Sequence, residues 1–138
     1  MREPMNPGAQ SPIGESLLWS RILRPGAAGT VVVGVQGEVD ALTAPRLAVT
    51  LTEQLATATL LVVDLSQVDF FGAAGLGVLV SAAARAAERA VTLRLVAGTR
   101  VRRVLSLVGL EEKLTVCATV AAALAHPHTS YCGSPDPE

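Results

Sequence analysis

Few side chains in this sequence of 138 residues could do chemistry, and they do not form a catalytic set. Three acids, Asp40, Asp64 and Asp69, are expected near strand ends, where an acid most often serves a turn or a cap. The body of the chain has no histidine and one lysine, so no nucleophile with an adjacent base can be assembled from the usual side chains. We therefore expect no enzymatic activity and no cofactor.

A glycine-rich segment, Gly72-Ala-Ala-Gly75-Leu-Gly77, lies where a buried strand is expected to pass into a helix. Phosphate-binding loops occur at such junctions. The spacing is G-x-x-G-x-G, however, whereas a dinucleotide site has G-x-G-x-x-G, and the lysine and hydroxyl of a P-loop are missing. The plainer interpretation is a tight strand-to-helix turn, and a small nucleotide-binding enzyme is the least favoured alternative.

The two cysteines and the two histidines lie toward the C-terminus, in a spacing that fits no metal-ligand pattern. We therefore expect no metal site. Cys117 is predicted at the end of a buried strand and Cys132 in a C-terminal tail, both as free thiols. Redox control through Cys117 and Cys132 is the alternative.

Charge and composition exclude several classes of protein. The chain has 11 basic and 12 acidic residues, so it lacks the basic footprint that grips phosphate backbones, and we expect no direct nucleic-acid binding. Its 50% hydrophobic content excludes disorder over the whole length. The longest apolar run, residues 73–84, is shorter than the roughly 20 residues of a membrane span, and no signal peptide is recognisable. We expect a cytoplasmic protein with no membrane insertion.

These residues must be positioned by strands that alternate with helices. A glycine-rich turn predicts a hairpin of the first two strands, and the helices between the later strands make those strands parallel. Threonines, Thr43 and Thr99, are expected to cap two of the helices. The patterns predict strands at 17–23, 30–37, 60–65, 92–96 and 114–117, and helices at 43–57, 74–89, 99–109 and 119–125. The core face of the second helix is assigned to Leu76, Leu79, Val80, Ala83 and Ala87.

The predicted fold class is α/β. A small mixed β-sheet, an N-terminal hairpin followed by parallel strands, is expected to pack with about four helices. Prolines gather near both ends of the chain, which predicts flexible tails at 1–15 and 127–138 around one domain at 16–126.

Four blocks, taken in order, carry a resemblance to a known family. They are Gly37-Glu-Val-Asp-Ala-Leu-Thr-Ala-Pro-Arg-Leu47, Leu61-Val-Val-Asp-Leu-Ser-Gln-Val-Asp-Phe70, Gly75-Leu-Gly-Val-Leu79, and the distal pair Leu93-Arg-Leu-Val96 and Val101-Arg-Arg-Val-Leu-Ser-Leu-Val-Gly-Leu110. Together they resemble the STAS family and, within it, the bacterial anti-sigma factor antagonists. The resemblance runs from Val31 to Leu124 and implies a STAS-like sandwich. The abundance of alanine and arginine suggests a bacterial gene of high GC content.

The resemblance implies a protein-binding switch that acts on transcription by partner switching. Such antagonists bind an anti-sigma factor, itself a serine kinase of the histidine-kinase-like ATPase type, and so free a sigma factor. The kinase phosphorylates a serine in a D-S-[ST]-G-L-G motif. The antagonist then dissociates, because roughly two negative charges enter a packed interface. Here Ala73 occupies the serine position and Gly72 that of the acid, so the phosphoacceptor chemistry is lost.

We therefore expect an antagonist that is not switched by phosphorylation at the usual position. The alternative on the same fold is a STAS scaffold or a transporter-associated regulatory subunit with a different protein partner. The partner surface is expected where strand-to-helix loops gather at one sheet edge. Its predicted residues are Asp40, Thr43, Arg46, Gly72, Ala73, Ala74, Gly75 and Leu76.

A small basic cluster, Arg100, Arg102 and Arg103, begins the third predicted helix. We interpret it as a solvated helix face, because surface charge runs are common. Contact with a partner is the alternative.

Overall fold

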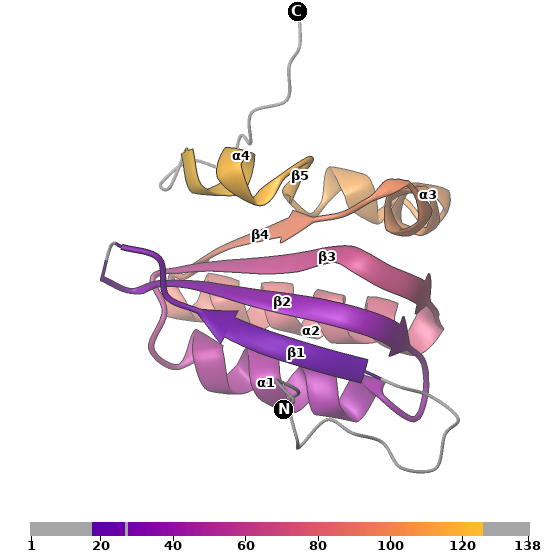
Figure 1. The fold of residues 1–138 in the computed structure, drawn as a ribbon, viewed down its shortest axis with the longest axis horizontal. Coiled ribbons are helices and arrows are strands. Elements are labelled where there is room, and N and C mark those ends of the chain that lie inside the picture. The colour runs from indigo at the N-terminus through magenta and orange to yellow at the C-terminus, as the bar shows by residue number, and fades with distance from the viewer. Residues whose placement is uncertain (1–17, 27, 126–138) are drawn as a thin grey trace, which may run out of the picture.

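The computed structural model describes residues 18–26 and 28–125, which form one β-sheet and its covering helices (Figure 1). The strands are β1 (Leu18–Leu23), β2 (Thr30–Val39), β3 (Leu60–Phe71), β4 (Thr92–Val96) and β5 (Val116–Cys117), and they neighbour one another in chain order. β1 is antiparallel to β2, and every later pair is parallel. The predicted fold class, a hairpin followed by parallel strands, is confirmed.

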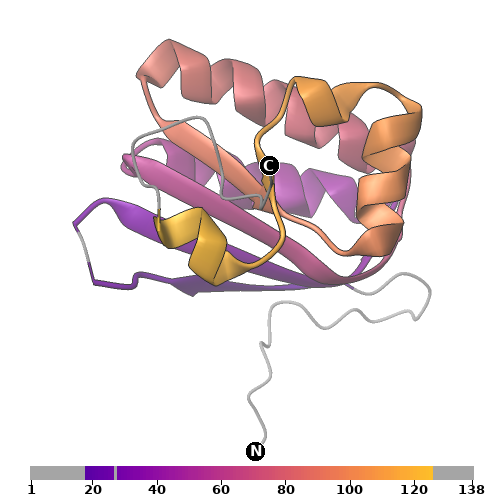
Figure 2. The same cartoon turned by 90° about the horizontal axis from the view of Figure 1, so that it is seen from above.

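The helices are α1 (Ala44–Leu55), α2 (Ala73–Arg89), α3 (Thr99–Leu107) and α4 (Val120–Ala125), with a 3-10 turn, η2, at Leu110–Glu112. α1 and α2 lie along one face of the sheet, and α4 covers part of the other (Figures 1 and 2). α3 lies at the end of the sheet where β2 and β3 finish. Within the described residues, each helix predicted from the sequence is therefore present.

Side-chain alternation along the strands produces two apolar layers. The larger layer lies between the sheet and α1, α2 and α3 and includes Val31 and Val33 of β2. The smaller layer lies beneath α4 and consists of Val32, Leu60, Val62, Val96, Cys117 and Ala123. The first residues of β3 are buried on both sides, as the continuous apolar run predicted.

The core face was predicted correctly for α1 and only in part for α2, where Leu79 is buried and Leu76 and Ala83 pack against the core. In α1, the buried residues include Leu47, Leu51 and Leu55, which recur at the predicted spacing of four. In α2, Val80 is 48% exposed and Ala87 is exposed, whereas the buried residues are Gly75, Leu79, Ala82 and Ala86. Alanine and glycine occur all around α2, so its periodicity marks the buried face only in part.

An arginine fastens α4 to the sheet. Arg94 of β4 is fully buried, and its Nη1 donates a hydrogen bond of 2.6 Å to the carbonyl oxygen of Ala123. That carbonyl belongs to the last turn of α4, where helix carbonyls lack partners within the helix and a positive charge is favoured. Burial lowers the pKa of Arg94 from its ordinary value, because removal from water disfavours the charged form.

β2 and β3 both continue past their predicted ends. β2 reaches Val39 and β3 reaches Phe71, and the last parallel pair joins these two residues. Two register irregularities accompany the extension, and Gly37, at the second, has a φ of 112°, which favours glycine. The strand ends are thereby held side by side.

The predicted tails, residues 1–15 and 127–138, lie outside the described residues. Among the helices that the structure describes, none combines the length and the apolar character that crossing a membrane requires.

Candidate functional site

The candidate site is the sheet edge at which β2 and β3 end. The backbone N–H of Gly72 donates to the carbonyl oxygen of Val39 at 2.9 Å, which ties the start of α2 to the end of β2. The loop after β2 and the first turn of α2 therefore lie side by side. Asp40, which follows Val39, therefore lies near Gly72, as expected for loops at the ends of neighbouring parallel strands.

The loop after β2 is closed by reciprocal hydrogen bonds between Asp40 and Thr43. Oδ1 of Asp40 accepts from the N–H groups of Leu42 at 2.9 Å and Thr43 at 3.0 Å. Oγ1 of Thr43 accepts from the N–H of Asp40 at 3.0 Å and donates to the carbonyl oxygen of Glu38 at 2.7 Å. This arrangement matches a capping box in which Asp40 is the capping residue.

The prediction that the Thr43 side chain caps α1 is consequently wrong, because its hydroxyl is used by Asp40 and Glu38. Thr43 is 2% exposed, so it supports the loop and offers no surface to a partner. The same prediction for Thr99 is also wrong. Gly98 is the N-cap of α3, and no side chain caps that helix.

Ala73 is the first residue of α2 and is exposed. Its N-cap, Gly72, has an extended backbone with φ −98° and ψ −172°, and no side chain caps the helix. A serine at this position would present its hydroxyl to solvent at the positive end of the helix dipole. The methyl group of Ala73 has the same position but cannot accept a phosphoryl group.

The next three residues of α2 turn inward. Gly75 is buried, and a β-carbon there would come 2.7 Å from Cγ1 of Val39 and 2.8 Å from Cε1 of Phe71. Ala74 and Leu76 are partly buried and pack against the larger apolar layer. Of the α2 residues predicted to bind a partner, Ala73 is thus the one most open to solvent.

Two exposed apolar side chains beside this turn were missed by the sequence analysis. Leu42 is 71% exposed and Phe70 is 54% exposed. The Phe70 ring lies 3.1 Å from where a β-carbon of Gly72 would be. Leu42 could have been noticed in the sequence, because it is a large apolar residue in the predicted turn between Asp40 and Thr43. We define Asp40, Leu42, Phe70, Gly72 and Ala73 as the Gly72 surface; its exposed apolar groups are typical of a protein-binding site.

Comparison with known proteins identifies the family. The sequence profile of the STAS domain matches residues 21–123. The chain belongs to the STAS domain family. This STAS domain is 32% identical, over 97 residues, to the anti-sigma-F factor antagonist RsfB of Mycobacterium tuberculosis, a match that covers 70% of this chain and 80% of RsfB.

Solved structures agree with this assignment. The crystal structure of an anti-sigma factor antagonist from Mycobacterium paratuberculosis superposes with a TM-score of 0.74 at 30% identity, covering 81% of this chain and 95% of that one. SpoIIAA in its unphosphorylated form gives a TM-score of 0.66 at 18% identity, covering 78% of this chain and 95% of that one. The phosphorylated form of SpoIIAA from Bacillus gives a TM-score of 0.62 at 17% identity, covering 78% of this chain and 98% of that one. At these lower identities, the likeness to SpoIIAA shows the shared fold.

Arg46 of this STAS domain has a structural contact. Its Nη2 donates to the carbonyl oxygen of Leu18 at 3.0 Å, which fastens α1 to the beginning of β1. Arg46 is partly buried by this arrangement. The bond gives Arg46 a role in the fold, alongside its predicted role in partner binding.

Of the remaining acids considered for catalysis, Asp64 has a local role for its carboxylate, and Asp69 is held through its backbone. Oδ1 of Asp64 accepts from the backbone N–H of Ser66 at 3.0 Å and from its hydroxyl at 2.6 Å. The backbone carbonyl of Asp69 accepts from Nη1 of Arg100 at 3.1 Å. In the part of the chain that the structure describes, no group of three or more histidine, cysteine, aspartate or glutamate residues could hold a metal ion.

Cys117 of this STAS domain ends β5 and is buried. It is disulfide-bonded, so the prediction of a free thiol at this position is wrong. Sequence periodicity predicts whether a cysteine is buried, but it carries no information on its oxidation state. Cys132 lies outside the described residues.

Proposed function

We propose that this STAS domain is an anti-sigma factor antagonist, which binds an anti-sigma factor and so frees a sigma factor for transcription. The named relatives support this function, since RsfB matches over most of its length and the Mycobacterium paratuberculosis antagonist matches in both sequence and fold. The proposed activity is binding of a protein, without catalysis. Its place of action is the bacterial cytoplasm.

The observation that carries the proposal is the exposure of Ala73 together with two exposed apolar side chains at the same end of the sheet. Phe70 comes just before the turn that leads to Ala73, Leu42 lies in the neighbouring loop after β2, and each exposes more than half of its surface. Burial of such side chains against a partner removes apolar surface from water, which favours a complex. A neutral methyl group at residue 73 is compatible with a dry interface of this kind.

Ala73 also keeps the protein in the unphosphorylated, partner-binding state. In relatives with a serine, phosphorylation would introduce roughly two negative charges at this point and disfavour a packed interface. Ala73 cannot be modified in this way, so the protein keeps the shape and charge of an unphosphorylated antagonist. Its activity is then set by its expression level or by a different signal.

We infer that the anti-sigma factor is a serine kinase of the histidine-kinase-like ATPase type. Support comes from the first turn of α2, where Gly75 keeps the close packing against Val39 and Phe71 that shapes the site. A kinase able to hold a serine at residue 73 of a relative can hold the smaller alanine without a clash. This protein would thus occupy the kinase without being consumed as its substrate.

Affinity capture from the native cells tests this function. Tagged wild-type protein is expected to recover a kinase-type anti-sigma factor, with residue 73 unmodified in the mass spectrum. The Ala73→Asp variant is expected to recover much less of it, and the Ala84→Asp variant, at an exposed position further along α2, is the matched control. Recovery of transporter or scaffold subunits in place of an anti-sigma factor would contradict the proposal.

A further inference from the structure

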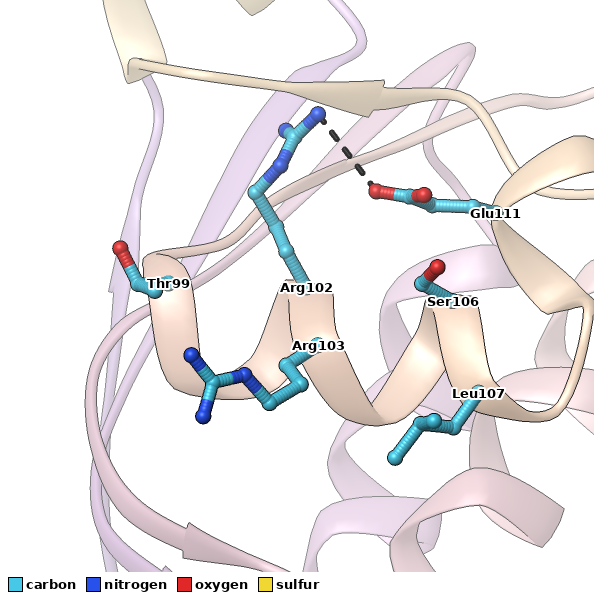
Figure 3. A pocket seen from close by; sticks show the side chains of 6 residues that line it. All are labelled: Thr99, Arg102, Arg103, Ser106, Leu107 and Glu111. Atoms are coloured by element: carbon cyan, nitrogen blue, oxygen red, sulfur yellow. Dashed lines mark ion pairs between the residues drawn. The ribbon is translucent and has the colours of Figure 1, made fainter.

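The outer side of α3 carries a shallow hollow of about 370 Å³. Its lining residues are Thr99, Arg102, Arg103, Ser106, Leu107 and Glu111 (Figure 3). In Figure 3 the Arg102 side chain extends toward Glu111 of η2, whereas Arg103 extends along the helix toward Thr99. The hollow is therefore lined on one side by the Arg102–Glu111 pair and on the other by Arg103 and the apolar side chain of Leu107.

The charge of this side of α3 is positive. The sequence of the helix, TRVRRVLSL, contains three arginines and no acid. Arg102 is within 3.5 Å of Glu111, an ion pair that neutralises one of the three. Arg100 donates to a backbone carbonyl, and among the described residues neither Arg100 nor Arg103 forms an ion pair with a carboxylate.

The end of α3 adds an apolar group to this positive surface. Leu107 is 79% exposed, more than any other large hydrophobic side chain that the structure describes, and its neighbour Val108 is also exposed. An apolar side chain so open to water, next to arginines, is typical of a protein contact that combines an apolar anchor with charged groups around it. We define Arg100, Arg103, Leu107 and Val108 as the α3 surface.

The α3 surface is joined to the Gly72 surface. The 3.1 Å hydrogen bond from Arg100 to the carbonyl oxygen of Asp69 holds the start of α3 against β3, one residue before Phe70. Figures 1 and 2 both place α3 at the end of the sheet where β3 passes into α2. The Gly72 surface as defined contains no basic side chain, and α3 adds the exposed positive charges of Arg100 and Arg103 beside it.

We propose that the α3 surface is the second half of the partner interface, and that it binds a segment of the anti-sigma factor in which carboxylates flank one apolar side chain. This inference rests on the proposed function and adds the chemistry of the partner. Arg100 and Arg103 pair with the carboxylates, and the apolar side chain packs on Leu107 in the hollow. Charge complementarity selects this partner segment and speeds its encounter with α3.

Affinity measurements with the purified anti-sigma factor test the inference. Arg103→Glu is expected to weaken binding about tenfold at 50 mM salt and about twofold at 500 mM, because exposed charge pairs are screened by salt. Leu107→Asn is expected to weaken binding about tenfold at both salt concentrations, because an apolar contact is lost and no charge is introduced. Arg85→Glu, which reverses an exposed arginine on α2, is the control and is expected to change affinity less than about twofold.

The outcomes separate this inference from the proposed function. Wild-type affinity in both Arg103→Glu and Leu107→Asn, together with weak binding by Ala73→Asp, would overturn the role of α3 and leave the antagonist function standing. An equal loss in Arg85→Glu would also overturn it, because a general charge effect would then explain the result. If the wild-type protein binds no anti-sigma factor, both proposals fail. All of these positions are exposed, and circular dichroism confirms that each variant is folded.

Discussion

The β-carbon position of Gly75 lies 2.7 Å from Cγ1 of Val39, so the first turn of α2 packs directly against the end of β2. The Phe71 ring closes the same space, with Cε1 at 2.8 Å and Cζ at 2.9 Å. Val39 and Phe71 are both buried and cannot swing aside. This contact determines where α2 begins and therefore presents Ala73 to solvent beside the end of β2.

Two glycines of α2, two residues apart, are expected to respond in opposite ways to alanine. Gly75→Ala should lower the free energy of unfolding by about 1–3 kcal/mol, because the added methyl overpacks the core. Gly77→Ala should raise it by about 0.5–1 kcal/mol, because a β-carbon there meets nothing within 4 Å and alanine favours the helix. Urea unfolding of both variants tests the pair; equal effects would show that the Gly75 contact is not tight.

Much of the fold could be predicted from the sequence, because its apolar periods are clear. The spacing of Leu47, Leu51 and Leu55 predicted α1, and the run at the start of β3 predicted a strand buried on both faces. The extension of β3 to Phe71 could not be predicted, because residues 66–69 include exposed polar side chains that interrupt the apolar pattern. Their backbone still pairs with β2, and hydrogen bonds of the backbone do not depend on side-chain polarity.

The candidate site was only partly visible in the sequence. The loops that carry Asp40 and Gly72 could be placed at one edge, since parallel strands end together. The inward role of Thr43 could not be predicted, because the hydroxyl has several partners within reach in different turns. Leu42 and Phe70 were missed because sequence patterns assign apolar residues to the core, and only the fold shows that these two are exposed.

Removal of the Thr43 hydroxyl should destabilise the loop after β2. Thr43→Val keeps the shape of the side chain but leaves the Asp40 N–H and the Glu38 carbonyl without this partner, and we expect a loss of about 1–3 kcal/mol in the free energy of unfolding. Thr52→Val, at an exposed position of α1, is the control and should stay within about 0.5 kcal/mol. A loss of partner affinity by folded Thr43→Val, at unchanged stability, would instead indicate a direct contact.

The buried Arg94 is expected to hold α4 on the sheet. Arg94→Ala removes the 2.6 Å hydrogen bond to the Ala123 carbonyl and leaves a cavity beneath the helix, so the unfolding free energy should fall by about 2–4 kcal/mol. In this variant, the rate of backbone amide hydrogen exchange should increase more in α4 than in the other helices. The exposed Arg85→Ala variant serves as the reference for loss of an arginine at the surface. Unchanged or raised stability of Arg94→Ala would mean that the cost of burying the charge outweighs its bond.

Ala90 ends α2 in a left-handed conformation, with φ 58° and ψ 37°. The N–H of the following Val91 bonds to the Ala86 carbonyl at 2.8 Å, as in a Schellman motif. Glycine adopts this conformation without strain. Ala90→Gly should therefore raise the free energy of unfolding by about 0.5–1 kcal/mol, which is measured as a higher thermal midpoint. Ala87→Gly, within the helix, should lower stability by about 1 kcal/mol. A drop in stability for Ala90→Gly would contradict the described end of α2.

The measurement that tests the central claim most directly is the affinity of the purified anti-sigma factor for variants at residue 73, by titration calorimetry. Ala73→Ser should bind like the wild type, because a small neutral side chain is retained. Ala73→Asp should bind at least about tenfold more weakly, because a charge enters the packed interface, although an acid at the start of a helix favours the fold. Ala84→Asp should bind like the wild type. Equal affinity of all four proteins would contradict the assignment of the Gly72 surface as the interface.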